Sequence, residues 1–166
     1  MITLYHGSST KVESPLVHLG RTDLDFGQGF YLTQLKEQAE AWAVIICSRK
    51  KNNPTPWLNT YRFDMDEAIS QGYKILRFES YNREWLDFIA ASRHGKAPWE
   101  GYDLIEGGVA NDKVVDAVEA YLAGLADVEH TLNKLVYTKP NNQICLLSQQ
   151  LIDCCLVYID SYKISE

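Results

Sequence analysis

Two short stretches near the start of the chain carry the residue types best suited to hold a ligand. Residues 4–8 read Leu-Tyr-His-Gly-Ser, and residues 25–33 read Asp-Phe-Gly-Gln-Gly-Phe-Tyr-Leu-Thr. A glycine lets the backbone turn sharply, or approach a ligand where a Cβ atom would clash. His6 and Tyr31 each lie close to such glycines on a predicted strand. This combination suits a flat, polar ligand that carries phosphate groups.

Taken singly, each of these residues has an ordinary structural explanation. A lone histidine at a strand end is more often a satisfied polar residue than a ligand. A tyrosine between Phe30 and Leu32 usually belongs to the core. Gly27 and Gly29 could simply form a tight turn. The histidine and the tyrosine together, with the two glycines between them, favour a binding site.

The neighbouring sequence predicts the elements that would hold these stretches. Residues 2–5 and 29–33 have the short apolar pattern of strands, and residues 35–50 have the periodicity of a helix. Thr33 is the expected N-cap of that helix, because its hydroxyl can accept a hydrogen bond from a free N–H group of the first turn. Trp42 belongs to the helical stripe that is expected to face the core.

The rest of the chain predicts short strands and helices in irregular order. Strands are predicted at residues 57–63, 73–78, 101–107, 143–147 and 154–158, with an extended piece at 16–19. Helices are predicted at residues 66–70, 84–94, 112–123 and 127–135, with a turn at 149–151. This order favours an α+β fold over a doubly wound α/β fold. The length of 166 residues predicts one domain spanning residues 1–166.

The overall charge limits which partners suit the surface. A formal net charge of −6 argues against a general nucleic-acid-binding surface, which needs clustered Lys and Arg. The one dense basic run, Arg49-Lys50-Lys51, follows the predicted helix of residues 35–50. Cations suit the C-terminal end of a helix dipole, so this run is interpreted as a solvated helix end. A local basic patch is the alternative.

The cysteines indicate a reducing compartment. They are Cys47, Cys145, Cys154 and Cys155, and no two of them form a C-x-x-C pair. We expect four free, mostly buried thiols in a cytoplasmic protein, with one of the two adjacent cysteines facing the core. The His and Cys spacings match no usual metal-ligand pattern, so no metal is expected and a zinc site is the weaker alternative. The start of the chain does not resemble a secretion signal, and no segment has the length of a membrane span.

The residues quoted above also carry a resemblance to a known superfamily. Residues 4–8, then 26–33, then a helix with Gln38-Ala39 and Trp42-Ala43, resemble the NAD-binding half of ADP-ribosyltransferases with a His-Tyr-Glu catalytic set. More narrowly, the chain resembles an uncharacterised bacterial family, the domain of unknown function 3990. Residues 102–112 and 142–145 are similar to that family as well. The resemblance implies an ADP-ribosyltransferase-like split antiparallel β core with flanking helices and an NAD cleft between its sheets.

The resemblance also implies roles for single residues. His6 would hydrogen-bond a ribose hydroxyl, the backbone of Gly7 would hold the nicotinamide amide, and Tyr31 would stack on the nicotinamide ring. Ser8 could add a polar contact. Arg21 could reach the diphosphate, since a guanidinium group pairs with phosphate, although a solvated loop arginine is an equal alternative. Gly27 and Gly29 would shape the cleft.

The third catalytic position departs from the superfamily pattern. Transferases of this branch carry a glutamate on a late strand, and Gln143 stands at the matching place. Glutamine can hydrogen-bond a ribose hydroxyl but cannot act as a general base. Asn111 and Asp112 could compensate by lining the site, or could simply cap the helix that follows.

The resemblance implies a mono-ADP-ribosyltransferase-like protein that uses NAD as its substrate. The acceptor would be a protein, a nucleic acid or a small molecule, and an intracellular toxin controlled by an antitoxin protein is one expected setting, with a defence effector as another. The alternatives are an NAD glycohydrolase, a non-catalytic module that binds NAD or ADP-ribose, and an interaction domain that uses its aromatic surface. That surface would comprise Trp57, Tyr61, Trp85 and Trp99.

Overall fold

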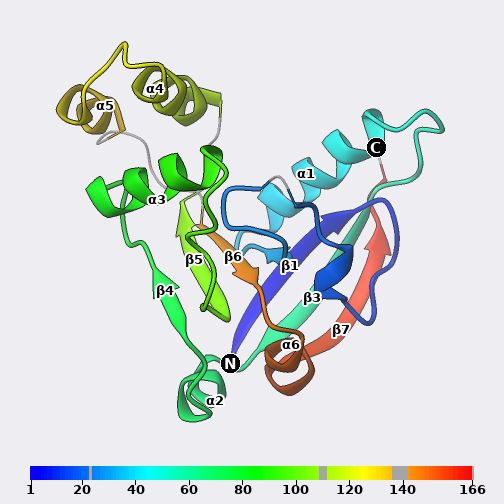
Figure 1. Ribbon diagram of the computed structural model, residues 1–166. Coiled ribbons are helices and arrows are strands. Elements are labelled where there is room, and N and C mark those ends of the chain that lie inside the picture. Colours follow the sequence, from blue (N-terminus) through cyan, green and yellow to red (C-terminus); the bar gives the residue numbers. More distant parts are fainter. Residues whose placement is uncertain (23, 109–111, 136–141, 166) are drawn as a thin grey trace.

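Two β-sheets with helices around them form the core of the protein (Figure 1). The computed structural model describes residues 1–22, 24–108, 112–135 and 142–165. One sheet has the strand order β1-β3-β7 and the other has the order β2-β6-β5-β4. Helices and strands are mixed without strict alternation. The α+β class predicted from the sequence is therefore confirmed.

The three-stranded sheet is antiparallel throughout. It consists of β1 (Ile2–Ser8), β3 (Trp57–Phe63) and β7 (Leu156–Lys163). Successive side chains point to opposite faces, as the strand period requires. One face buries large apolar residues such as Leu4 and Tyr61 against the other sheet.

The other face of this sheet is covered at one end by α1 (Lys36–Ser48). The helix approaches β1 closely because Gly7 has no side chain there. A Cβ atom at Gly7 would lie 1.9 Å from the backbone oxygen of Ala39 and 2.9 Å from the backbone nitrogen of Ala43. Both alanines are buried. Small residues on the two elements thus set the position of α1.

The four-stranded sheet consists of β2 (Phe30–Leu32), β6 (Asn142–Leu146), β5 (Leu104–Gly108) and β4 (Ile75–Arg77). Its strands pair antiparallel except for β4 and β5, which are parallel. The chain joins this parallel pair through α3 (Arg83–Arg93), as a parallel connection requires a crossover. The antiparallel core expected from the resemblance thus contains one parallel pair.

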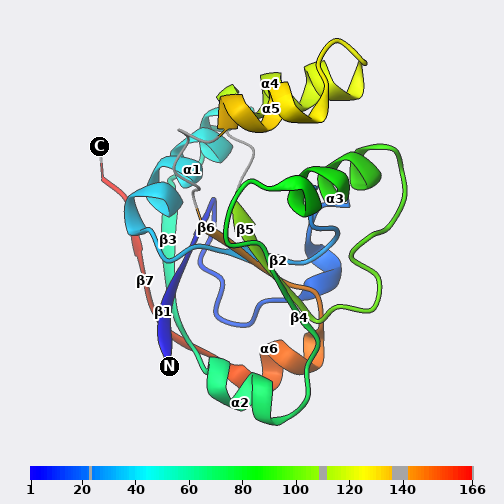
Figure 2. The same cartoon turned by 90° about the vertical axis from the view of Figure 1, so that its left-hand side faces the viewer.

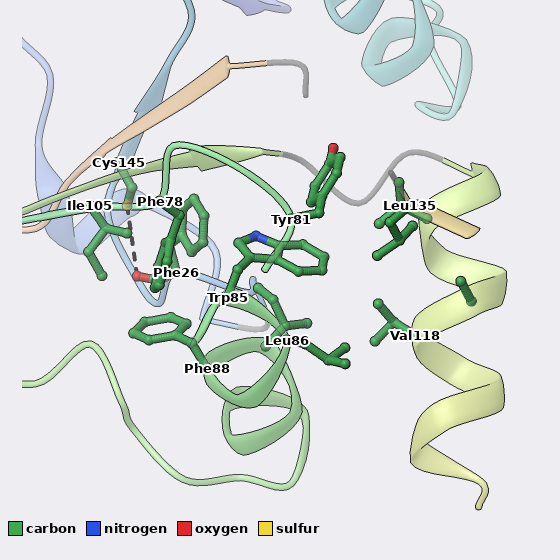
Figure 3. Packing of buried hydrophobic residues seen from close by; sticks show 13 residues of the cluster. Phe26, Phe78, Tyr81, Trp85, Leu86, Phe88, Ile105, Val118, Leu135 and Cys145 are labelled. Atoms are coloured by element: carbon green, nitrogen blue, oxygen red, sulfur yellow. Dashed lines mark hydrogen bonds between the residues drawn. The ribbon is translucent and has the colours of Figure 1, made fainter. Parts of the chain in front are cut away.

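A second apolar cluster covers the face of the four-stranded sheet that points away from β1 (Figure 3). Phe26, Phe78 and Trp85 lie at its centre, and the Trp85 indole N–H donates a hydrogen bond of 3.2 Å to the Gly108 carbonyl oxygen. The side-chain oxygen of Asn82 accepts a hydrogen bond from the Trp85 backbone N–H and so caps α3.

Two further helices complete this side of the molecule, α4 (Asp112–Leu122) and α5 (Val128–Leu135). They lie beside each other above α3 in both views (Figure 2). At the opposite end of the molecule, α2 (Met65–Ser70) packs against α6 (Gln149–Cys155). A single 3₁₀ turn, Val17–Leu19, replaces the extended piece expected there.

The start of α1 differs from the sequence prediction. Leu35 is the N-cap residue, and no side chain caps the helix. Thr33 lies two residues earlier, where its hydroxyl oxygen accepts a hydrogen bond of 3.1 Å from the Leu35 N–H. Trp42 was expected in the core but is 42% exposed. The narrow contact with Gly7 leaves room only for the alanines of α1, so the indole lies outside.

The apolar run at residues 154–158, predicted as a strand, begins in a helix. Residues 149–151, predicted as a turn, belong to α6, which continues through Cys155, and β7 begins at Leu156. The prediction that one of the adjacent cysteines faces inward is confirmed, because Cys155 is buried and Cys154 is exposed. All four cysteines are free thiols, and three of them are buried. In the described part of the chain, no helix is long and apolar enough to cross a bilayer.

Candidate functional site

The two stretches singled out in the sequence meet where β1 and β2 come together. The Tyr5 N–H donates a hydrogen bond of 2.8 Å to the Thr33 carbonyl oxygen, and the Thr33 N–H donates one of 3.0 Å to the Tyr5 carbonyl oxygen. This isolated pair joins an edge of one sheet to an edge of the other. His6 and Tyr31 therefore become neighbours.

His6 is held directly against β2. Its Nδ1 atom lies 2.7 Å from the Tyr31 carbonyl oxygen, and its ring is tilted against the Phe30 ring at a centroid distance of 4.5 Å. A carbonyl oxygen can only accept a hydrogen bond, so Nδ1 carries the proton. In the neutral ring, Nε2 is then left as an acceptor. His6 is thus prepared to accept a hydrogen bond from a ligand hydroxyl.

The environment of His6 favours this neutral form. Burial lowers the pKa of His6 below its ordinary value of 6.5, and the hydrogen bond to the Tyr31 backbone raises the pKa by a smaller amount. The imidazole is consequently uncharged near neutral pH.

Asn59 fixes the end of β1 from the neighbouring strand. It is fully buried on β3 opposite His6, and its side-chain oxygen accepts a hydrogen bond of 2.8 Å from the Val12 N–H. Its amide nitrogen lies 3.3 Å from three oxygens, those of the His6 carbonyl, the Ser8 hydroxyl and the Thr10 carbonyl. Asn59 is not among the site residues predicted from the sequence. Its signal was a polar side chain on the otherwise apolar face of an alternating strand.

Tyr31 is half-buried on the face of the four-stranded sheet that the helices cover. Its hydroxyl donates a hydrogen bond of 2.6 Å to the Gly27 carbonyl oxygen, and its backbone pairs with Cys145 on β6. Burial raises the pKa of Tyr31, so the phenol stays protonated. Because the hydroxyl is already engaged, a ligand contact by Tyr31 would come from its ring.

The site glycines are required by packing within the protein. Gly27 has φ +86°, a backbone conformation that residues with a Cβ atom rarely adopt. The Trp99 ring lies against Gly27. A Cβ atom at Gly29 would lie 2.5 Å from the Cys145 sulfur. Packing within the protein therefore accounts for Gly7, Gly27 and Gly29 without a ligand.

Gln143 lies on β6 at the edge of this region. It is half-buried and pairs with Gly107, which presents no side chain beside it. Since side chains alternate along a strand, Gln143 shares a face with Cys145, which lies about 7 Å further along β6. Tyr31 pairs with Cys145 and so shares this face. Extending the register of β2 and β6 by one pair places Thr33 beside Gln143.

The flank of α1 forms the remaining border of the site. The Thr33 hydroxyl lies 3.5 Å from the side-chain oxygen of Gln38. Trp42 lies one helical turn after Gln38 on the same flank, because residues four apart are neighbours on a helix. Its exposed indole therefore adds an aromatic surface close to the junction of β1 and β2. Trp42 belongs to the residues that carry the family resemblance, which is its sequence signal. The helical pattern predicts a buried Trp42, so an exposed aromatic surface at this position is not expected.

The other predicted site residues lie at varying distances from this junction. Ser8 is bonded to the Thr10 backbone and to Asn59. Arg21 is exposed in the loop after Gly20, which packs on the Gly29 backbone. Asn111 lies outside the described residues, and Asp112 begins α4, with its side chain outside the description. Within the described ranges, no three metal-binding side chains gather closely enough to hold an ion.

Comparison with known proteins places the chain in one family. A family model described as "Protein of unknown function (DUF3990)" matches residues 2–158. The chain belongs to this family. The DUF3990 match spans every site residue from His6 to Gln143, which confirms the narrower resemblance seen in the sequence. No curated protein and no solved structure matches the chain.

Proposed function

We propose that the protein binds NAD where β1, β2 and β6 meet and transfers its ADP-ribose unit to an acceptor. The observation that carries the proposal is the contact of 2.7 Å between His6 Nδ1 and the Tyr31 carbonyl oxygen, which joins two stretches that are 25 residues apart. The resemblance of these stretches to ADP-ribosyltransferases supplies the ligand.

The reaction makes limited demands on the protein. The bond between the nicotinamide nitrogen and C1′ of the ribose breaks, nicotinamide leaves as a neutral molecule, and positive charge develops on the sugar. The acceptor attacks C1′ and loses a proton. Such a reaction depends chiefly on positioning NAD and stabilising the developing charge.

His6 would hold a ribose hydroxyl through Nε2, the atom left as an acceptor by the Nδ1 contact. The lowered pKa of His6 keeps this acceptor available near neutral pH. Two aromatic rings could pack on the nicotinamide, Tyr31 from β2 and the exposed Trp42 from α1. The Gln143 amide could hydrogen-bond a hydroxyl of the ribose that carries the nicotinamide.

Gln143 limits the chemistry further. An amide cannot remove the proton of an incoming hydroxyl, so polymer elongation is disfavoured and transfer of a single unit is favoured. The same residue supports a second candidate function, a module that binds NAD or ADP-ribose without turnover. Hydrolysis of NAD by water is the third outcome that the site chemistry allows.

The first test combines binding and turnover. Purified protein is incubated with adenine-labelled NAD and a cell lysate, and both label transfer and nicotinamide release are measured. The His6→Ala and Tyr31→Ala variants should lose the signal, and calorimetry should show weaker NAD binding. Matched controls are His130→Ala and Tyr102→Ala, which change exposed residues.

The outcomes separate the candidate functions. Labelled acceptor supports the transferase, and nicotinamide release without label indicates a glycohydrolase. NAD binding without either product indicates the binding module. Unchanged NAD affinity in folded His6→Ala and Tyr31→Ala proteins would refute the proposed site.

The biological setting that fits this proposal is a cytoplasmic toxin held in check by an antitoxin protein. Cytoplasmic NAD would then be the substrate. Expression of the wild-type chain in bacteria should arrest growth, whereas the His6→Ala variant should not. Equal growth arrest by both proteins would argue against a role for this site in toxicity.

A further inference from the structure

The side of α1 that points away from the sheet carries a row of residues spaced four apart, which we call the outer ridge. Its members are Glu37, Ala41, Ile45 and Arg49. The buried residues of α1 are Ala39, Ala43 and Cys47, each two positions after a member of the outer ridge. Two positions correspond to a rotation of about 200° at 3.6 residues per turn. The outer ridge therefore lies opposite the row that packs on β1 (Figure 1).

Apolar side chains on and beside the outer ridge are exposed. Ile45 is 39% exposed, and Ala41 is exposed as well. Val44, 49% exposed, flanks the ridge on one side, and Trp42 flanks it on the other. A surface helix usually carries polar residues opposite its buried stripe. A contiguous exposed apolar patch indicates an interaction surface.

The two ends of the outer ridge carry opposite charges. Glu37 lies in the first turn of α1, and Arg49 is the C-cap residue, which keeps right-handed helical backbone angles. The Arg49 guanidinium carbon lies 6.0 Å from the centre of the Trp42 ring, so this side chain lies back along the helix. The ridge thus reads acidic, small, large and basic along the chain.

The neighbouring charges of α1 turn toward the sheet instead. The Tyr162 hydroxyl on β7 donates a hydrogen bond of 2.6 Å to the Glu40 carboxylate, and the Lys36 ammonium nitrogen lies 5.5 Å from the centre of the Tyr162 ring. The Lys50 ammonium group donates a hydrogen bond of 2.7 Å to the Ser9 hydroxyl, directly after β1. These three side chains therefore lie away from the outer ridge.

We infer that the outer ridge binds a second copy of this chain, with the two α1 helices antiparallel about a two-fold axis. Rows of residues spaced four apart interdigitate in the commonest mode of helix packing. An axis level with Ala43, the midpoint of the ridge, sets Glu37 of each copy beside Arg49 of the other. It also sets the small Ala41 beside the larger Ile45 of the other copy, so that the apolar middle is covered in both.

The order of charges selects this arrangement. A parallel pair of helices would place Glu37 beside Glu37 and Arg49 beside Arg49, and like charges repel. The antiparallel pair makes two attractive contacts instead. A surface that is complementary to itself is what a two-fold interface requires, whereas a different protein would need no such symmetry. This is the reason for assigning the surface to a second copy.

This inference does not depend on ADP-ribosyl transfer. One helix from each copy makes a small interface, so the dimer should be a weak one. Trp42 flanks the outer ridge and also borders the proposed NAD site, so the second copy would lie close to that site in both protomers.

The test is sedimentation equilibrium of the purified chain at about 5–500 μM, which reports the dissociation constant of a weak dimer. Ile45→Asp is compared with Ile69→Asp, which changes an exposed apolar residue of α2. Glu37→Arg is compared with Glu84→Arg, which changes an exposed glutamate in the first turn of α3. Arg49→Glu and the double variant Glu37→Arg/Arg49→Glu complete the set, and circular dichroism establishes that each protein is folded.

The wild-type chain should show a monomer–dimer equilibrium, and Ile45→Asp should weaken it at least about tenfold. Glu37→Arg and Arg49→Glu should each weaken it about tenfold, because both charge pairs of the symmetric interface become repulsive. The double variant restores both pairs and should dimerise within about threefold of wild type. An equimolar mixture of the two single variants should also associate, since opposite charges then meet at both ends. The two controls should dimerise as the wild type does.

Several outcomes would overturn the inference. A wild-type chain that stays monomeric at about 500 μM would do so, and would leave the outer ridge to a different protein. Dimerisation that Ile45→Asp leaves unchanged, or that Ile69→Asp weakens equally, would place the interface elsewhere. A double variant that dimerises no better than the single charge variants would refute the antiparallel arrangement.

Discussion

Replacing Gly7 with alanine should displace α1 from β1 and destabilise the protein. The added Cβ atom would lie 1.9 Å from the Ala39 backbone oxygen, whereas real Cβ atoms essentially never come closer than 3.0 Å to such neighbours. It would also lie 2.9 Å from the Ala43 backbone nitrogen. Both atoms belong to the helix backbone, so no side-chain rotation can relieve the contact. The helix must move by more than an ångström.

The cost can be estimated from overpacking in other protein cores. Such changes cost about 1–3 kcal/mol, and a contact with backbone on two successive turns belongs at the upper end, about 3 kcal/mol. For a chain of this size, 1 kcal/mol corresponds to about 2–4 °C in Tm. We therefore expect the Tm of Gly7→Ala to fall by about 6–12 °C.

Thermal unfolding followed by circular dichroism measures this effect. Gly107→Ala is the matched control, because its Cβ atom would meet the side chains of Phe26 and Phe78 at 3.1–3.2 Å, a much milder contact. Its Tm should fall by only a few degrees. A Tm for Gly7→Ala within about 2 °C of wild type, or an equal loss in the control, would refute the packing argument.

Three further predictions concern the site. Because the pKa of His6 is lowered in the folded state, the unfolded chain binds the proton more tightly, and the free energy of unfolding should fall as the pH drops below 6.5. Denaturant titrations should show a shallower decline for His6→Gln, and parallel curves would contradict the assignment. Tyr31→Phe removes the hydrogen bond to the Gly27 carbonyl and should cost about 1 kcal/mol, read as a Tm lower by about 2–4 °C. An unchanged Tm would mean that this bond adds nothing. Gln143→Glu supplies a carboxylate and should raise nicotinamide release by about 100-fold, with Gln150→Glu as the exposed control. Equal release by both variants would exclude a catalytic position for residue 143.

Local pattern was enough to predict several elements of the fold. The alternation of residues 57–63 predicted β3 with the bounds that the structure has. The strand predicted at residues 154–158 is wrong for its first two residues, because a short apolar run can belong to a helix or to a strand. Neighbouring strands decide that question, and here β7 pairs with β3 only from Leu156 onward.

The candidate site was predictable only in its sequence-local parts. His6 and Tyr31 stand out because of their types and the glycines near them, and the structure places the His6 ring against the Tyr31 backbone. The strand pattern marks Asn59 as an unusual polar residue on an apolar face, but it does not predict its role, since its partner Val12 lies 47 residues away along the chain. The exposure of Trp42 depended on the closeness of a helix to Gly7, which periodicity does not report.

The pairing of Tyr5 with Thr33 has a consequence for motion in the protein. These two residues form an isolated bridge between sheets that otherwise have separate ladders. If the sheets hinge apart, the amide protons of Tyr5 and Thr33 would exchange with solvent together, ahead of those inside each ladder. A ligand that contacts both His6 and Tyr31 would stabilise this bridge between the two sheets. Hydrogen exchange at these two amides would therefore report occupancy of the site before any product is sought.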